Sequence, residues 1–192
     1  MEKYLGKKNI AVLISGRGSN LKSLIKYSKK KNSLFKIKLV ISNNFNAKGL
    51  EIANKSKIKN HYIKYSNKEN FENRSLKLLK KHNIDLICLA GFMKILSKRF
   101  IKNFSKPILN IHPSLLPKYK GLNTHYKVIK NREKFTGATV HIVNEKLDAG
   151  KIIIQEKVKI LKSDIIKTLE KKVLKIEHKI YPKAIIKLIT NY

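Results

Sequence analysis

The sequence predicts a single α/β domain, spanning residues 1–192, built on a mostly parallel, doubly wound (Rossmann-like) sheet. Its 192 residues are enough to bury the core of one domain. Short apolar runs rich in β-branched residues alternate with segments of helical period, the pattern of parallel strands joined by helices. The last apolar runs follow one another without a helix between them, so we expect antiparallel strands toward the C-terminal part.

The individual elements follow from the same periodicities. Period-two or continuously apolar runs predict strands at 9–14, 35–41, 61–64, 85–90, 107–111, 138–143 and 151–158. Segments with apolar residues at three-to-four spacing predict helices at 19–31, 47–56, 68–82, 97–104, 124–131 and 164–189. No internal repeat or linker interrupts this series, and one domain is therefore expected.

The net charge of +32 raises the question of a polyanionic partner. Arginine stands at only four positions, 17, 74, 99 and 132, so nearly all of the 44 basic residues are lysines. A surface selected to grip phosphates usually also uses arginine, whose fork binds them bidentately. The lysines are spread along the whole chain, and isoleucine and asparagine are abundant too, as an AT-rich genome would produce. We expect no specific nucleic-acid partner; a selected polyanion-binding surface is the alternative, and a steep salt dependence of RNA binding would reveal it.

Several classes of protein are disfavoured by composition. No apolar run approaches the length that spans a bilayer, and the basic, then briefly apolar N-terminus lacks a signal-peptide cleavage site, so we expect a cytoplasmic protein without membrane contact. The one cysteine, Cys88, lies within an apolar strand and cannot form a disulfide framework. No histidine–carboxylate set has the spacing of metal ligands, and we expect no metal.

The segment ISGRGSN (14–20) connects the first predicted strand to the first helix. Glycines there permit a tight turn, the N–H groups at the helix start favour an anion, and Ser19 or Asn20 could cap the helix. A dinucleotide fingerprint would need glycine where Leu21 stands and an acidic residue about twenty positions later, and neither is present. We interpret the turn as a site for a phosphorylated small molecule; a purely structural tight turn is the alternative.

The stretch LNIHPSLLPKYKGLNTH (109–125) contains two of the four prolines, with a third at 107. Asn110 and His112 alternate at the end of a predicted strand, so both should face one side of the sheet at its carboxyl edge, where open α/β sheets bind ligands. Pro113 should end the strand, and Leu116–Pro117 should keep the following loop extended. A side-chain amide can donate to a developing oxyanion and an imidazole can move protons, although His112 could instead be a capping or core residue.

A second polar position follows the strand predicted at 138–143. Asp148 lies in NEKLDAG (144–150) and is one of only 12 acidic residues. A carboxylate beside His112 would raise the pKa of that imidazole, but sequence distance cannot bring the two together, and Asp before Ala-Gly is also a common turn residue. His141 and His178 are interpreted as structural.

Taken together, five motifs resemble the glycinamide ribonucleotide formyltransferases of purine synthesis, in their small single-domain form. They are VLISGRGSNL (12–21), LAGFMKILS (89–97), LNIHPSLLPKYKG (109–121), LDAG (147–150) and EHKIYP (177–182). The resemblance implies a formyltransferase-type fold and transfer of a formyl group from 10-formyltetrahydrofolate, as co-substrate, to the amine of 5′-phosphoribosylglycinamide, in the pathway to IMP.

The resemblance also implies roles for particular residues. Asn110 would hydrogen-bond the formyl oxygen, His112 would stabilise the charge and transfer protons, and Asp148 would orient His112. The residues implied for ribonucleotide binding are Gly18, Ser19, Asn20, Leu21, Lys22 and Glu177. Those implied for folate binding are Lys68, Met93, Lys94, Ile95, Leu96, Asn110, Asn144, Glu145, Lys146, Leu147 and Asp148. Lys68 and Lys94 stand where relatives often have arginine, and Lys151 where they often have proline, so the resemblance implies a folate site that differs from theirs in charge pattern and in the stiffness of its loop.

Three alternatives to this activity remain open. A methionyl-tRNA formyltransferase shares the Asn-x-His and Asp residues but is expected to carry a further C-terminal domain. A formyltetrahydrofolate hydrolase is expected to carry a regulatory N-terminal domain. The non-enzymatic alternative is an α/β scaffold that binds RNA through its lysines. The sequence leaves open whether the protein is a monomer or a homodimer.

Overall fold

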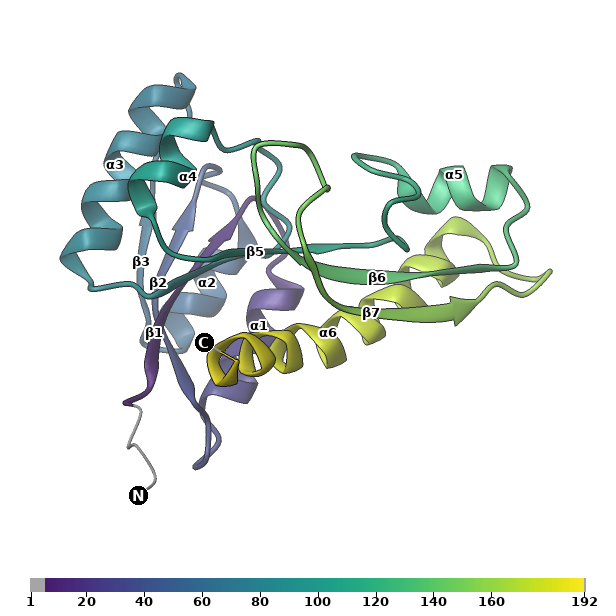
Figure 1. Cartoon of the computed structure of the whole chain (residues 1–192), viewed down its shortest axis with the longest axis horizontal. Helices are drawn as coiled ribbons and strands as arrows, with labels where there is room; N and C mark the ends of the chain where they lie inside the picture. Colours follow the sequence, from purple (N-terminus) through teal and green to yellow (C-terminus); the bar gives the residue numbers. More distant parts are fainter. Residues whose placement is uncertain (1–5, 192) are drawn as a thin grey trace. The chain divides into compact units, whose positions relative to one another are not determined.

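The computed structural model describes residues 6–191 and divides the chain into two compact units, 1–108 and 109–192, with the boundary inside one strand. Figure 1 labels the elements along the chain. The expectation of a single domain over 1–192 stays a prediction.

The first unit consists of parallel strands joined by helices. Its elements are β1 (Lys8–Ile14), α1 (Ser19–Ser28), β2 (Phe35–Ser42), α2 (Lys48–Lys55), β3 (Lys59–Tyr62), α3 (Lys68–Lys81), β4 (Leu86–Leu89) and α4 (Lys98–Phe104). Strand β1 pairs in parallel with β2 and β4, and β2 pairs in parallel with β3. Parallel neighbours need crossover connections, which these helices supply.

The strands of the second unit pair antiparallel. The boundary between the two units lies within the first of these strands. Its elements are β5 (Ile108–His112), α5 (Thr124–Lys130), β6 (Phe135–Ile142), β7 (Ile152–Lys159) and α6 (Ile166–Thr190). Strand β6 pairs antiparallel with both β5 and β7. Helix α6 packs against β6 and β7, along which it runs in Figure 1.

The strand order β3-β2-β1-β4-β5-β6-β7 confirms the predicted fold class, a mostly parallel sheet with antiparallel strands toward the C-terminal part. Element boundaries differ from the predicted ones by a few residues. Strand β6 begins at Phe135 rather than 138, because Gly137 fits against β7 where a Cβ would meet the main-chain oxygen of Glu156. A glycine weakens the strand signal of the sequence, which therefore places the start of this strand after Gly137.

The cores explain why these segments form these elements. In the first unit the central strand β1 is almost wholly apolar from Ile10 to Ile14, and all five side chains are completely buried. A strand flanked by strands on both sides and covered by helices is expected to read as such a continuous run. In the second unit Leu169, Val173 and Ile180 of α6 recur at helical spacing and are completely buried, as the predicted apolar stripe requires.

Candidate active site

In the first unit, the turn after β1 is tight because two glycines touch. Gly18 is left-handed (φ 73°), and a Cβ there would lie 2.6 Å from the Cα of Gly49, so no other residue fits without displacing α2. The helix begins at Ser19 with Gly18 as its N-cap, and no side chain caps it. The expectation that Ser19 or Asn20 caps α1 was therefore wrong, because both residues lie within the helix, after its N-cap residue Gly18.

The other residues predicted to bind the ribonucleotide differ in how exposed they are to solvent. Leu21 is completely buried, so only its main chain could meet a ligand, whereas Lys22 is exposed. Asn20 is 7% exposed. Glu177, in the second unit, lies on α6 and is also 7% exposed. The N–H groups of the first turn of any helix lack intrahelical partners, so the start of α1 keeps the anion preference expected of it.

The segment predicted to contact folate in the first unit follows β4. Met93 and Ile95 are 62% and 58% exposed, unusual for such apolar side chains, while Leu96 is buried. The Met93 N–H donates to Ser15 Oγ (2.8 Å), which fixes this segment to the turn after β1. The ammonium of Lys94 lies 4.5 Å from the ring centre of Tyr65. Apolar side chains held open to solvent on an anchored main chain can cover one face of a planar ligand.

Lys68 is placed differently. It is exposed and is the first residue of α3, where the Asn67 side chain caps the helix by accepting from the Asn70 N–H (2.8 Å). Among the described residues, no hydrogen bond or ion pair holds its ammonium, which is exposed and could meet an acidic group of a ligand.

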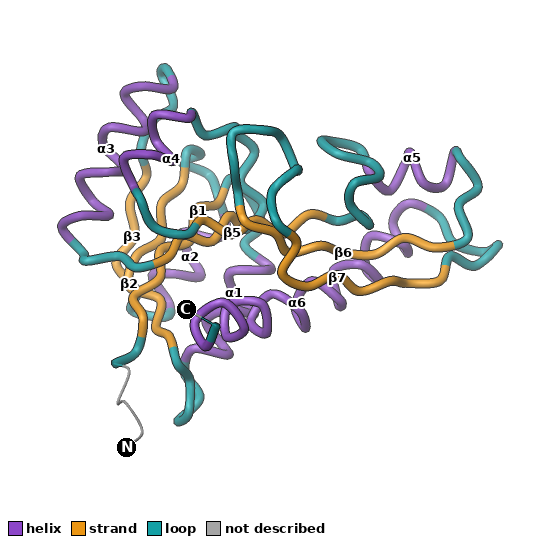
Figure 2. The backbone as a smooth tube through the Cα atoms, viewed as in Figure 1, coloured by secondary structure: helices purple, strands orange, loops and turns teal. Residues whose placement is uncertain are grey.

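In the second unit, Asn110, His112 and Asp148 lie together. Asn110 and His112 end β5 on the same face, as their alternation predicts, and Asp148 comes from the loop between β6 and β7, drawn in teal in Figure 2. The Asn110 amide Nδ2 donates to Asp148 Oδ1 (3.3 Å), and Asp148 Oδ2 lies 3.4 Å from His112 Nδ1. The Asp148 Oδ2 also accepts from the Gly121 N–H (2.9 Å). The Asp148 carboxylate thus accepts from the Asn110 amide and from the Gly121 N–H, and it lies beside the His112 imidazole.

The two nitrogens of His112 face different acceptors. Nε2 lies 2.8 Å from the main-chain oxygen of Tyr119, and because a carbonyl only accepts, Nε2 carries a proton. Nδ1 faces Asp148. In the neutral ring Nδ1 is the unprotonated nitrogen, and a proton that it takes up is placed next to the carboxylate.

Burial dominates the electrostatics of His112. Its side chain is 7% exposed, and this burial lowers the pKa of His112 below its ordinary value, outweighing the Tyr119 carbonyl and the Asp148 carboxylate, which both raise it. The Asp148 carboxylate raises the pKa of His112, as expected from the sequence, but the effect of burial is larger. Burial also opposes ionisation of Asp148, yet His141, the Gly121 N–H and His112 outweigh it and hold the pKa of Asp148 below its usual range.

His141 was interpreted as structural, and the structure places it in this cluster. Its Nε2 lies 3.2 Å from Asn110 Nδ2 and 3.6 Å from Asp148 Oδ1, while its Nδ1 faces the main-chain oxygen of Ile142. The tautomer with a proton on Nδ1 accepts from the Asn110 amide. The register of the sheet would have identified His141 as a member of the cluster, because His141 pairs with Asn110 across β5 and β6. Register cannot be read from one strand alone.

The loop after β5 differs from its prediction. Leu116–Pro117 is a cis peptide bond, and residues 116–119 form a turn in which the Lys118 N–H donates to the Leu115 oxygen. The predicted extended loop was therefore wrong. Ser114 Oγ donates to the main-chain oxygen of Lys118 (2.7 Å), and these bonds fold the loop back so that the Tyr119 oxygen reaches His112.

The turn that carries Asp148 depends on Gly150. Asn144, Glu145, Lys146 and Leu147, all predicted to contact folate, are exposed, whereas Asp148 is buried in the left-handed conformation (φ 46°), which aspartate tolerates better than most residues. Two residues later, a Cβ on Gly150 would collide with the main-chain oxygen of Ile142. The close approach of these two main-chain segments thus holds the turn that presents the carboxylate.

Replacing Gly150 with alanine should therefore destabilise the protein. We expect Gly150→Ala to lower the free energy of unfolding by about 1–3 kcal/mol, the usual cost of forcing extra atoms into a packed site, measured by urea denaturation. Gly16→Ala is the matched control, since a Cβ there meets nothing within 4 Å. Equal stability of the two variants would contradict this account of the turn.

Two further observations concern clusters of metal-binding side chains and the length of apolar helices. Among residues 6–191, no group of three or more histidine, cysteine, aspartate or glutamate side chains could hold a metal ion. Within the same part of the chain, no helix is both long enough and apolar enough to cross a membrane.

Comparison with known proteins assigns the family. The formyl transferase family pattern matches residues 8–185. Phosphoribosylglycinamide formyltransferase of Haemophilus influenzae is 42% identical over 181 residues, which cover 93% of this chain and 85% of that protein. The crystal structure of phosphoribosylglycinamide formyltransferase from Anaplasma phagocytophilum superposes with a TM-score of 0.89 at 44% identity, covering 98% of this chain and 88% of that one. The chain belongs to the formyl transferase family.

Longer relatives contain the same region as one part. The trifunctional purine biosynthetic protein adenosine-3 of Bos taurus is 44% identical over 183 residues, covering 93% of this chain. The chain spans only 18% of the length of that relative.

Proposed function

We propose that this protein transfers a formyl group from 10-formyltetrahydrofolate to the amine of 5′-phosphoribosylglycinamide, giving formylglycinamide ribonucleotide and tetrahydrofolate in de novo purine biosynthesis. The observation that carries the proposal is the cluster that Asn110 and His112 of β5 form with Asp148, in which the carboxylate lies 3.3 Å from the Asn110 amide and 3.4 Å from the His112 imidazole. The bacterial relatives that this chain covers over most of their length bear the name of this activity.

The chemistry needs a donor for an oxygen that gains charge and an acceptor for a proton. The substrate amine attacks the formyl carbon, so a C–N bond forms and the carbonyl electrons move to the formyl oxygen. Asn110 Nδ2 donates to that oxygen by giving up its bond of 3.2 Å to His141 Nε2, because an oxyanion is the stronger acceptor. No covalent enzyme intermediate is needed.

Proton transfer falls to His112. Because its pKa lies below its ordinary value, the ring is neutral at neutral pH, and Nδ1 accepts the proton that the attacking amine loses. The Asp148 carboxylate then stabilises the imidazolium from 3.4 Å. When the tetrahedral intermediate collapses, the bond to the folate nitrogen breaks and that nitrogen takes the proton, which returns His112 to its neutral form.

The binding residues are proposals of the same kind. In the first unit, Gly18–Lys22 bind the ribonucleotide phosphate through main-chain N–H groups and the exposed Lys22, and Met93–Leu96 and Lys68 bind folate. In the second unit, Asn144–Leu147 contact the folate ring system with Asn110 and Asp148, and Glu177 binds the ribonucleotide. We further propose a cytoplasmic protein that binds small-molecule substrates and uses neither a metal nor a specific nucleic-acid partner.

The proposal is tested by following deformylated folate spectrophotometrically with a 10-formyl folate analogue. We expect release only when the ribonucleotide is present. Release without it would identify a hydrolase instead. Release only with charged methionyl-tRNA would identify the tRNA formyltransferase activity.

A further inference from the structure

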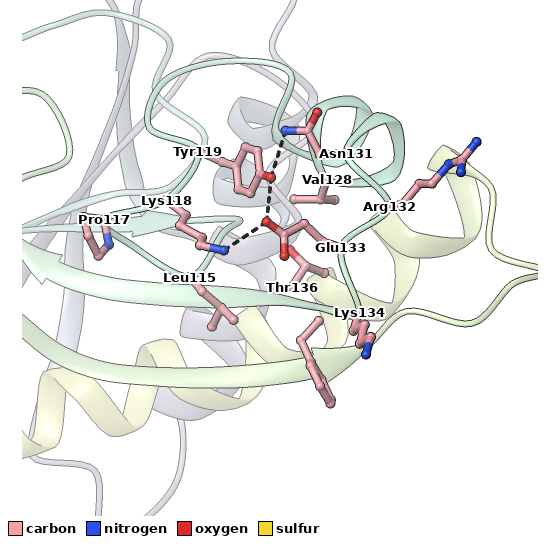
Figure 3. A pocket seen from close by; sticks show the side chains of 11 residues that line it. Leu115, Pro117, Lys118, Tyr119, Val128, Asn131, Arg132, Glu133, Lys134 and Thr136 are labelled. Carbon is pink, nitrogen blue, oxygen red and sulfur yellow. Dashed lines mark hydrogen bonds and ion pairs between the residues drawn. The ribbon is translucent and has the colours of Figure 1, made fainter.

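The second unit contains a cavity of about 700 Å³ that none of the proposed substrate residues lines. Its walls come from the loop after β5, the end of α5 and the start of β6 (Figure 3). Leu115, Pro117, Val128 and Phe135 supply apolar surface. This volume lies within the range of pockets that enclose small organic ligands.

A polar network lies in the cavity. Glu133 Oε1 accepts from the Tyr119 hydroxyl (2.8 Å) and from the Lys118 ammonium (3.0 Å), and the Asn131 amide donates to the same hydroxyl (3.0 Å), as the dashed lines in Figure 3 show. Both bonds to Glu133 end on one carboxylate oxygen. The second oxygen, Oε2, receives no donor from the described residues and is free to accept from a ligand.

The wall of the cavity holds a buried hydroxyl without a partner. Thr136 is 2% exposed, and its Oγ1 has no hydrogen-bond partner among the described residues. Buried polar atoms are nearly always paired, so this hydroxyl is an unusual feature of the cavity wall.

Cations stand at the edge of the same cavity. Arg132 and Lys134 line it on either side of Glu133, and in Figure 3 the Arg132 side chain extends outward from the Tyr119–Glu133 network. The interior thus offers an acceptor between apolar walls, and the rim offers positive charge.

We propose that this cavity is a second binding site, one that takes a nucleoside monophosphate. The planar base would lie between the apolar walls with its amino group donating to Glu133 Oε2, and the phosphate would meet Lys134 at the rim. A base alone leaves the cations unused, and a phosphate alone leaves the apolar walls and the acceptor unused, so the combination fits the lining best.

The cavity is connected to the proposed active site through one loop. Tyr119 presents its hydroxyl to the cavity network, while its main-chain oxygen accepts from His112 Nε2 (2.8 Å). Lys118 similarly donates from its ammonium to Glu133, while its main-chain oxygen accepts from the Ser114 hydroxyl. A ligand that moves the Tyr119 side chain therefore also acts on the Tyr119 main-chain oxygen, which accepts from His112.

Isothermal titration calorimetry with adenosine monophosphate (AMP) tests the site, with adenosine and ribose 5-phosphate as the two halves of the probe. We expect AMP to bind at sub-millimolar concentration and each half at least about tenfold more weakly. Lys134→Ala and Glu133→Gln should each weaken AMP binding by about tenfold, as loss of a charge-assisted contact does. Lys162→Ala, an exposed lysine of the same unit outside the cavity, is the charge-matched control and should leave binding unchanged.

The variant Lys22→Ala separates this site from the proposed phosphate turn in the first unit. AMP binding that falls in Lys22→Ala but not in Lys134→Ala would place the nucleotide on that turn and overturn the proposal. Absence of AMP binding to the folded wild-type protein would overturn it as well. Because calorimetry requires no turnover, either result is independent of the formyl-transfer activity.

Discussion

Asn110→Ala should lower kcat by about 10²–10³-fold, the loss measured elsewhere when one oxyanion donor is removed. In the resting structure the Asn110 amide bonds His141 (3.2 Å) and Asp148 (3.3 Å), both long distances that a developing oxyanion can displace. The effect should therefore fall on kcat and kcat/KM alike, because the interaction strengthens only in the transition state.

The matched control for this variant is Asn103→Ala, which truncates an exposed asparagine on α4. It should leave kcat unchanged. Chemical denaturation should show that Asn110→Ala loses only about 1 kcal/mol of folding free energy, the value of a typical hydrogen bond. Near-normal kcat in a folded Asn110→Ala protein would remove Asn110 from the mechanism.

Asp148→Asn should produce the second large loss and should change the pH dependence in a definite direction. The ionised carboxylate raises the pKa of His112, so its removal lets burial lower that pKa further. If neutral His112 is the base, activity falls as pH drops through its pKa, and the acid limb of the kcat/KM profile should move to lower pH in the variant. At neutral pH, kcat should still fall by about 10²-fold or more, since the imidazolium loses its partner at 3.4 Å.

The pH profile distinguishes this role from a merely structural one. A variant that only loosened the turn at Gly150 would lower kcat without displacing the acid limb. Asp164→Asn is the control, because that carboxylate bonds Lys172 and Thr168 near the start of α6 and has no described contact with His112. An acid limb that stays in place, or moves to higher pH, would contradict the proposed pairing of Asp148 with His112.

The sequence predicted the fold well because its signals are local. The continuous apolar run of β1 and the helical stripe of α6 each specify their own element, and both lie in the core as expected. The departures come from contacts between distant segments. Gly137 belongs to β6 because of its fit against β7, and the cap of α1 is Gly18 because of its contact with Gly49.

The candidate site was predictable in part for the same reason. Alternation places Asn110 and His112 on one face, since the strand alone determines this. The position of Asp148, the approach of His141 and the main-chain bonds from Tyr119 and Gly121 depend on register and loop geometry. The net pKa shift of His112 depends on burial, which only the packed structure supplies.

The most direct test of the central claim follows the formyl carbon itself. The wild-type protein and His112→Ala would each be incubated with 10-formyltetrahydrofolate labelled isotopically at the formyl carbon and with 5′-phosphoribosylglycinamide, and the product examined by NMR. The account predicts that the label appears on the ribonucleotide amine with the wild-type protein and at a strongly reduced rate with folded His112→Ala. Label recovered as free formate, or transfer that proceeds equally fast without His112, would contradict it.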